Sequence, residues 1–411
     1  MRLGNRGPGA TWRYAERYLG AGTRTYSRFA ADLEISPTYH PQHGAPSFAV
    51  PTFWLEPHHG AWLCNGLASP LPALYRDGAL LLLPVHPEVL DTPDLPGREV
   101  LRHVRRGPPL QVEPSANART VFVRGMDGRE VVPHFVKLHY PKRLSRFTRR
   151  LRRPIIELQL WVAAELARVG APLLPEVAGA VLGHDPVQAW GFLARDARAL
   201  DSHDGADSDE LTYTVPLFAL YGRDVHAPDD PTLLEQLIVR SGQDAGTWAS
   251  RHLVEPMIRL WCDVLLRTGC AIELHGQNTL LRFAADGRRS RLAYRDCAVY
   301  VDPALRAEQG LTGPLPPRNV ISRDIRKPRA QVFSLVYDSF MGSHTLDYVA
   351  RLVQDRFGVD PAVLHRHATD VFADAAGRDD LLPSTVAYYD NQLHDDGGWE
   401  VVDTGIAPRW R

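Results

Sequence analysis

Five polar side chains gather in two short stretches of the second half of the chain. Glu273, His275, Gln277 and Asn278 lie within six residues, and Asp296 follows the next apolar run. The apolar runs on either side of ADGRRSR predict a β-hairpin, which brings Asp296 toward Glu273 and Asn278. Two carboxylates and an amide oxygen suit Mg²⁺. The alternative, given even weight, is a strand end whose polar groups satisfy the backbone of its loop.

Basic residues gather around another predicted hairpin, at 119–140. Two runs rich in β-branched and aromatic residues flank a Met-Asp-Gly turn, a strong hairpin signal. Arg119 begins one strand, Lys137 ends the other, and Arg149 follows in the basic stretch 142–153. Guanidinium groups bind phosphate oxygens in pairs and lysine adds a compact charge, so these residues predict triphosphate binding. A solvated basic helix face is the simpler interpretation for most charges of 142–153.

The elements that must position these residues are short strands followed by helices. Asp- and Ser-rich residues 201–210 predict a boundary loop. Apolar residues at helical spacing predict helices, and apolar runs between turns predict strands. The sequence therefore predicts an α+β protein with antiparallel sheets and a helical C-terminal half. The expected strands are 48–55 and 79–85, and the expected helical regions are 11–33, 154–169, 231–241, 252–268 and 330–372.

The overall composition narrows the class of protein. The chain has 411 residues, 47 basic and 48 acidic, and 44% hydrophobic residues. This balance argues against a protein that coats nucleic acid or an anionic membrane. No apolar run reaches the roughly 18 residues that a membrane span needs. The scattered cysteines, which predict reduced thiols of a cytoplasmic protein, are Cys64, Cys262, Cys270 and Cys297.

Several motifs occur in the order typical of one family. They are L-P-V-H-P (83–87), A-N-A-R-T (116–120), K-L-H-Y-P-K-R-L-S-R-F-T-R (137–149), E-L-H-G-Q-N (273–278) and Y-R-D (294–296). In these motifs the chain resembles the NRPS-independent siderophore synthetases of the aerobactin- and achromobactin-synthetase type, with a shortened N-terminal part. The resemblance implies a multi-domain cupped hand with an ATP site between fingers and palm. It implies a reduced thumb-like region at 1–80, an ATP-binding fingers-like domain at 81–205 and a palm-like domain at 206–411.

The resemblance also assigns nucleotide-binding residues. The family's ATP-binding serine falls on Asn117 and its arginine on Arg119. Its lysine falls on Lys137, and its T-S-x-x-R motif on Ser145 through Arg149. Asn117 thus replaces a serine, which is the best support for a degenerate, non-catalytic member.

The second hairpin receives the remaining roles. The resemblance makes Glu273, Asn278 and Asp296 the metal ligands and Gln277 an ATP contact. His275 is placed beside the reacting carboxylate and phosphate, and it joins Lys137 and Arg149 as a catalytic residue.

The expected activity is that of a ligase dependent on ATP and Mg²⁺. Such an enzyme adenylates a carboxylic acid and condenses it with an amine or hydroxyl group, releasing AMP and pyrophosphate. Its expected partners are small-molecule substrates and, since the family is often dimeric, a second copy of the chain. Two alternatives stay open: a kinase-like phosphotransferase, which also uses a lysine, an asparagine and a later aspartate, and a non-catalytic nucleotide-binding protein.

Overall fold

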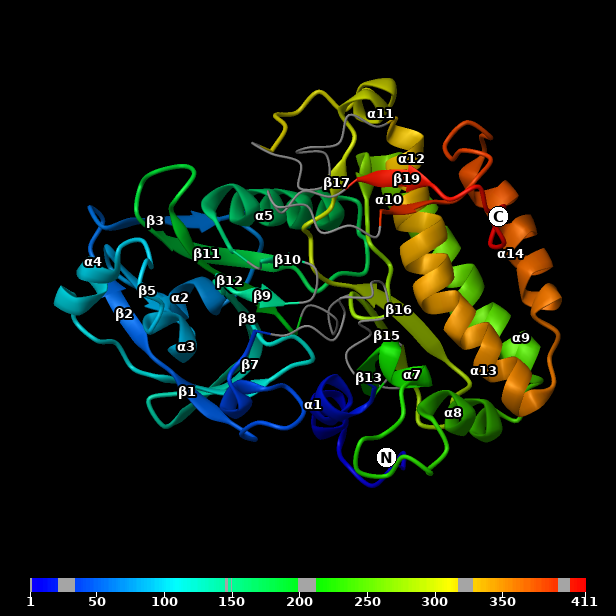
Figure 1. The fold of residues 1–411 in the computed structure, drawn as a ribbon, viewed down its shortest axis with the longest axis horizontal. Coiled ribbons are helices and arrows are strands. Elements are labelled where there is room, and N and C mark those ends of the chain that lie inside the picture. Colours follow the sequence, from blue (N-terminus) through cyan, green and yellow to red (C-terminus); the bar gives the residue numbers. More distant parts are fainter. Residues whose placement is uncertain are drawn as a thin grey trace.

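Two lobes make up the computed structural model, which describes residues 2–20, 34–144, 147–148, 150–198, 212–316, 328–390 and 400–411. Figure 1 shows a sheet-rich lobe, coloured blue to green, beside a helix-rich lobe, coloured green to red. Each lobe has its own large hydrophobic core. The mixture of helices and antiparallel sheets confirms the predicted α+β class.

A seven-stranded antiparallel sheet organises the first lobe, in the order β1-β6-β7-β8-β12-β11-β3. One face packs on helix α5 through Ile156, Leu160 and Leu193, and the other contributes to the larger core shared with the small sheet β2-β5-β4. The elements are β1 Phe48–Val50, β2 Thr52–Leu55, β3 Gly60–Cys64, α2 Leu71–Leu74, β4 Arg76–Asp77, β5 Leu80–Pro84, α3 Pro87–Leu90, α4 Arg98–His103, β6 Leu110–Pro114, β7 Thr120–Met126, β8 Arg129–Leu138, β9 Arg143–Leu144, β10 Phe147–Thr148, α5 Arg153–Arg168, β11 Glu176–Leu182 and β12 Trp190–Asp196, with a 3-10 turn η1 at Pro37–Tyr39.

The predicted hairpin at 119–140 is confirmed as β7 and β8. Asp127 and Gly128 turn the chain with φ of 53° and 74°, the positive values that a tight hairpin turn needs. The register places Thr120 opposite Lys137. The run at 48–55 is divided at Pro51 into β1 and β2, which join different sheets, because proline has no N–H for the ladder.

Helices surround the sheet β13-β15-β16 in the second lobe. The predicted helical regions at 231–241, 252–268 and 330–372 are confirmed, and Gly269 ends α10 with φ of 68°. The elements are β13 Tyr213–Pro216, α7 Phe218–Tyr221, α8 Leu233–Ser241, α9 Ala245–Ala249, the π-helical segment η3 Ser250–Val254, α10 Glu255–Thr268, β14 Cys270–Ala271, β15 Thr279–Phe283, β16 Ser290–Tyr294, β17 Tyr300–Val301, α11 Pro303–Glu308, α12 Arg329–Ser334, the π-helical segment η4 Leu335–Leu346, α13 Asp347–Phe357, α14 Pro361–Ala376, β18 Ala387–Tyr389 and β19 Val401–Asp403.

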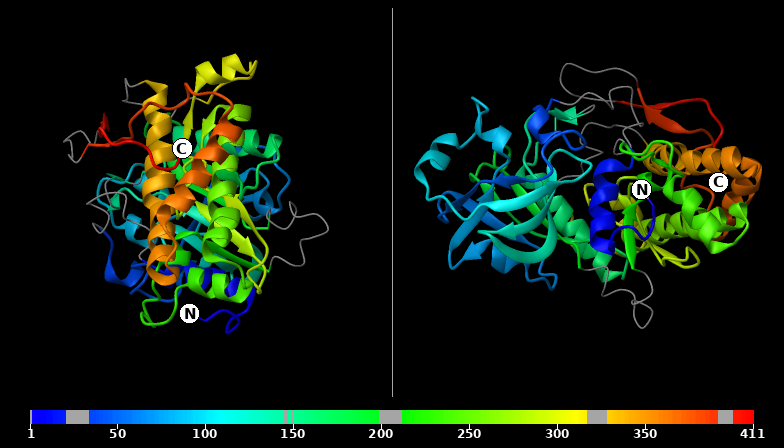
Figure 2. Two further views of the ribbon diagram at one scale, coloured as in Figure 1. Left: turned by 90° about the vertical axis from the view of Figure 1, so that its right-hand side faces the viewer. Right: turned by 90° about the horizontal axis from the view of Figure 1, so that it is seen from below.

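The N-terminal helix α1, Pro8–Tyr18, packs with the second lobe although it precedes the first in the chain. Ala15 and Leu19 belong to the core of the second lobe, and both views of Figure 2 place this blue helix beside that lobe. The predicted boundary loop at 201–210 lies outside the described residues, and the division into three domains stays a prediction. Among the described helices, none is both long and apolar enough to cross a bilayer.

Candidate active site

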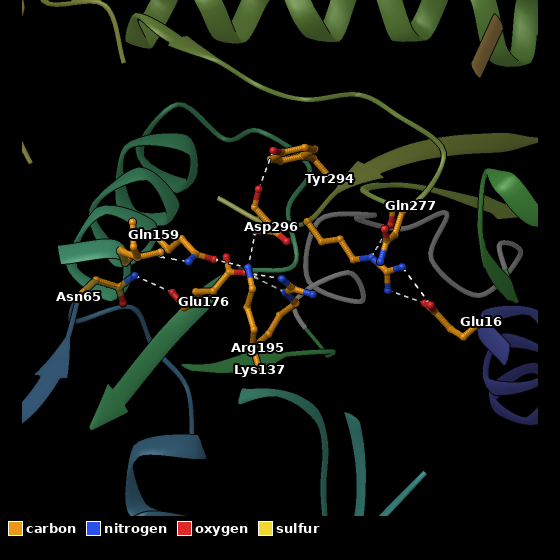
Figure 3. Close-up of polar contacts among 11 residues, drawn as sticks. Glu16, Asn65, Lys137, Gln159, Glu176, Arg195, Gln277, Tyr294 and Asp296 are labelled. Carbon is orange, nitrogen blue, oxygen red and sulfur yellow. Dashed lines mark hydrogen bonds and ion pairs between the residues drawn. The ribbon is translucent and has the colours of Figure 1, made fainter. Parts of the chain in front are cut away.

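Lys137 lies where the two lobes meet. Its side chain is 4% exposed and comes from β8 of the first lobe. The ammonium donates to Asp296 Oδ1 at 2.7 Å and to Gln159 Oε1, on α5, at 2.9 Å (Figure 3). Burial lowers the pKa of Lys137 to about 8, and Asp296 partly offsets that effect. The lysine that the sequence assigned to phosphate therefore meets the aspartate assigned to the metal.

Asp296 follows β16 by two residues and bends the chain sharply, with φ of 75°. Its backbone carbonyl accepts a hydrogen bond from the Tyr294 hydroxyl at 2.7 Å. Its side chain is 30% exposed, far more than that of Lys137. Burial would raise the pKa of Asp296, but Lys137 and Arg195 hold it well below its usual value. The carboxylate is therefore ionised and open on one side.

The H-G-Q-N segment forms a tight turn before β15. The backbone N–H of Gln277 donates to His275 Nδ1 at 3.2 Å, and that of Asn278 donates to His275 O at 3.0 Å. His275 Nε2 lies 4.0 Å from Glu273 Oε2. A Cβ on Gly276 would lie 2.3 Å from Tyr221 Oη, so a larger residue here would force Tyr221 or the turn to shift. The turn thus fixes the orientation of the His275 ring.

The three predicted metal ligands come together through their main chains. The Tyr294 hydroxyl accepts from the Glu273 N–H at 3.4 Å while donating to Asp296 O. Asn278 O accepts from the Arg295 N–H at 2.9 Å. Asn278 is 6% exposed, and its side-chain amide makes no hydrogen bond with any described residue. These oxygen donors fit Mg²⁺, which takes few protein ligands and completes its shell with phosphate and water. Metal binding itself stays a prediction.

Among the residues that the structure describes, imidazole, thiolate and carboxylate groups alone form no metal site. Within the described part of the chain, no three His, Cys, Asp or Glu side chains are close enough to hold an ion together. The described residues therefore contain no cluster of the kind that holds zinc tetrahedrally.

The structure describes some, but not all, of the residues predicted to contact the nucleotide. Asn117 Oδ1 accepts from the Arg119 N–H at 3.1 Å, before β7. Arg119 is buried and close enough to Lys137 and Asp296 to lower the pKa of both. Ser145 and Arg149 lie outside the described residues. The structure therefore brings Arg119, Lys137 and Asp296 together, and these roles stay predictions.

Two charged residues of the site were missed from the sequence. Arg195 donates to Glu176 Oε1 from Nε at 3.0 Å and from Nη2 at 2.5 Å, and both side chains are buried. Burial would lower the pKa of Arg195, but Glu176 and Asp296 raise it. The available signal was charge confined to one end of each apolar strand: Glu176 begins EVAGAVL, and Arg195 and Asp196 end WGFLARD.

A second buried ion pair lies beside the site. Arg295 bonds both carboxylate oxygens of Glu16 on α1, with Nη2 to Oε2 at 3.0 Å. Its Nε donates to Gln277 O at 2.9 Å. This pair fastens α1 to the H-G-Q-N turn (Figure 3).

Solved siderophore synthetases have a similar fold. Aerobactin synthetase IucC of Klebsiella pneumoniae matches with a TM-score of 0.61 and 19% identity over 88% of this chain and 72% of its own. The ATP-bound aerobactin synthetase IucA of the same organism gives 0.62 and 16%, over 97% and 78%. Petrobactin biosynthesis protein AsbB of Bacillus anthracis gives 0.64 and 13%, over 89% and 67%. The chain therefore has the siderophore-synthetase fold, which confirms the predicted resemblance at the level of fold.

Sequence comparisons add one partial match. Residues 246–395, less than half of the chain, match the family model described as ferric iron reductase FhuF-like transporter. No curated protein matches the chain significantly.

Proposed function

We propose that this chain is an ATP- and Mg²⁺-dependent ligase that adenylates a carboxylic acid. The acyl group then passes to an amine or hydroxyl group, and AMP and pyrophosphate are released. The fold of the siderophore synthetases, one of them solved with ATP, supports this class. The observation that carries the proposal is the buried Lys137, which reaches across the lobes to an open carboxylate.

Lys137 has one donor left for a ligand. An ammonium has three N–H donors, and two are used on Asp296 and Gln159. The third, together with the Arg119 guanidinium, would neutralise charge on the triphosphate. Both cations are buried, so each interaction is stronger than in water.

Glu273, Asn278 and Asp296 would hold Mg²⁺. When bound, the ion would supply positive charge to the phosphate oxygens. In this set, the Asn278 amide has no hydrogen-bond partner among the described residues, and the Asp296 side chain is 30% exposed, so both could accept the ion.

His275 would act on the reacting groups. A carboxylate oxygen of the substrate attacks the α-phosphorus and pyrophosphate leaves; the nucleophile then attacks the acyl carbon and AMP leaves. Because His275 Nδ1 accepts the Gln277 N–H, the ring proton of the neutral imidazole is on Nε2. That N–H would stabilise the charge that develops in either step.

Nucleotide product analysis tests the proposal. The protein is incubated with ATP, Mg²⁺, a panel of di- and tricarboxylates, and hydroxylamine as a general nucleophile. We expect AMP, pyrophosphate and a hydroxamate with at least one acid, and their loss in Lys137→Ala and Asp296→Ala. Arg259→Ala, which removes one side of an exposed ion pair, is the control that should retain activity.

The other outcomes identify the alternatives. ADP and phosphate would contradict the ligase and favour the kinase-like phosphotransferase. ATP binding without turnover across the panel would favour the non-catalytic nucleotide-binding protein.

A further inference from the structure

Three charged residues lie on one face of the seven-stranded sheet, on its side toward the second lobe. Glu176 on β11 is the register partner of Arg195 on β12. Lys137 on β8 is the partner of Leu193, two residues before Arg195. Directly opposite residues of an antiparallel pair share a face, as do residues two apart in a strand. Glu176, Arg195 and Lys137 therefore form a diagonal row on the face that carries α5.

Both cations of this row act on Asp296. Lys137 bonds it directly at 2.7 Å. Arg195 lies beside Lys137 in Figure 3, and its positive charge also lowers the pKa of Asp296. Within this row Asp296 therefore has two cationic neighbours, of which Lys137 alone hydrogen-bonds to it among the described residues. Arg119, outside the row, also lowers the pKa of Asp296, with a smaller effect.

Arg195, which makes no hydrogen bond with Asp296, has a side chain better shaped than that of Lys137 for binding a carboxylate. A guanidinium donates two parallel hydrogen bonds to the two oxygens of a carboxylate, whereas an ammonium binds as a point charge. Where no other anion competes, we therefore expect Arg195 to bond both oxygens of Asp296. Glu176 competes by accepting from Nε and Nη2 with one oxygen. Among the described residues Nη1 of Arg195 has no hydrogen-bond partner, so the hydrogen bonds of this guanidinium there are the two to Glu176.

We propose that Glu176 is a positioning residue that keeps Arg195 off Asp296. Asp296 then retains Lys137 on Oδ1 and an open side for a ligand. The identity of that ligand, Mg²⁺ with the ATP phosphates, rests on the proposed function, whereas the role of Glu176 does not. Glu176 itself touches neither Lys137 nor Asp296 through a hydrogen bond in the described structure.

A double-mutant cycle on Mg²⁺–ATP binding, measured by calorimetry, tests this role. Glu176→Gln keeps one acceptor but removes the competing charge. We expect it to weaken Mg²⁺–ATP binding at least tenfold in the otherwise native protein. In a protein that also carries Arg195→Met, Glu176→Gln should change Mg²⁺–ATP binding less than twofold. No guanidinium is then present that could move onto Asp296.

The sign of the effect separates positioning from simple electrostatics. Removing a negative charge from the site would strengthen the binding of an anionic nucleotide if only the overall field mattered. Equal or tighter Mg²⁺–ATP binding in Glu176→Gln would therefore overturn the proposal. Equal weakening in both backgrounds would overturn it as well.

A control variant tests whether the loss of a buried ion pair elsewhere also weakens Mg²⁺–ATP binding. Arg306 is buried and paired with Glu165 at 2.9 Å, at the junction of α5 and α11. Glu165→Gln should leave Mg²⁺–ATP affinity within twofold of the native value. If Glu176→Gln does not fold, Glu176→Asp replaces it, with an expected weakening of at least threefold that disappears in Arg195→Met.

A crystal structure of Glu176→Gln without nucleotide gives a readout independent of catalysis. We expect Arg195 to bond both oxygens of Asp296 and Lys137 to lose its contact. An unchanged Arg195 would contradict the proposal. Because this readout needs no ATP, failure of the ligase assay in the native protein leaves it intact, and the two failures can be distinguished.

Discussion

Two neighbouring residues, Arg295 and Asp296, form ion pairs of opposite character. Arg295 joins Glu16 through two hydrogen bonds, and its Nε donates to Gln277 O. Glu16 also accepts from Trp12 Nε1 at 2.9 Å. Both partners are buried, and the carboxylate and the guanidinium are each bonded on more than one atom. This pair joins α1 to the second lobe and has little left to offer a ligand.

The pair between Asp296 and Lys137 is incomplete by comparison. One carboxylate oxygen holds one ammonium, the carboxylate is partly exposed, and the ammonium has a donor left. It also joins the two lobes, so a ligand bound there would contact both. Burial alone therefore does not separate the two kinds of ion pair. The structural pair uses most of its hydrogen-bonding atoms within the protein, whereas the pair that could bind a ligand keeps a donor and an exposed carboxylate.

Removing Glu16 should have the largest effect on stability. Glu16→Ala leaves Arg295 buried without its counter-ion, which costs about 3–5 kcal/mol in comparable cases. Urea unfolding should show a loss of that size in the free energy of unfolding. A loss below about 1 kcal/mol would mean that the pair is not the structural one.

Removing Lys137 should separate function from stability. Lys137→Met is expected to lower the rate of AMP formation by about 10²–10³-fold, as for other preorganised charged donors. Its effect on the free energy of unfolding should be less than half that of Glu16→Ala, because Asp296 is partly exposed and water can solvate it. A single-turnover assay and urea unfolding measure the two quantities. Equal stability losses in the two variants would remove the distinction.

In contrast to the two ion pairs, His139 is a buried polar residue that the folded protein keeps uncharged. Burial and neighbouring arginines lower its pKa to about 3, and its Nδ1 accepts from the Leu151 N–H. Since the unfolded chain binds this proton near pH 6.5 and the folded chain does not, stability falls as the pH decreases from 6.5. The loss by pH 4 is at most about 3 kcal/mol.

His139→Asn tests this sign. Asparagine keeps an acceptor for Leu151 but does not titrate, so unfolding between pH 6.5 and 4 should depend less on pH than in the native protein. An identical pH dependence in both proteins would show that His139 does not contribute.

Gly276→Ala should have a smaller effect on stability than Glu16→Ala. The added methyl group meets Tyr221 Oη at 2.3 Å and Phe218 N at 3.1 Å. Overpacking of this kind costs about 1–3 kcal/mol. Because Gly276 follows His275, AMP formation should fall by more than the stability loss explains when measured well below the unfolding temperature. Full activity would show that the turn tolerates the shift.

Local signals predicted most of the fold that positions the site. The Asp127-Gly128 turn and the apolar runs gave β7 and β8, and helical spacing gave α5 and α10. Those features depend on residues close together in the chain. The motifs also pointed to Lys137 and Asp296, although nothing in the sequence showed that they bond each other.

The missed parts depend on contacts between distant segments. Glu16 and Arg295 are 279 residues apart, and no periodicity relates α1 to the hairpin of the second lobe. Glu176 and Arg195 meet only because β11 and β12 pair in one register. A slip of one residue would move a side chain to the other face, so strand sequences alone did not identify this pair.

Oxygen transfer from the acid to AMP tests the central claim most directly. An acid substrate labelled with ¹⁸O in its carboxylate is turned over with ATP, Mg²⁺ and hydroxylamine, and the nucleotide is analysed by mass spectrometry. If the carboxylate attacks the α-phosphorus, the AMP carries one ¹⁸O from the acid. Unlabelled AMP, or ¹⁸O in inorganic phosphate together with ADP, would contradict adenylation at this site.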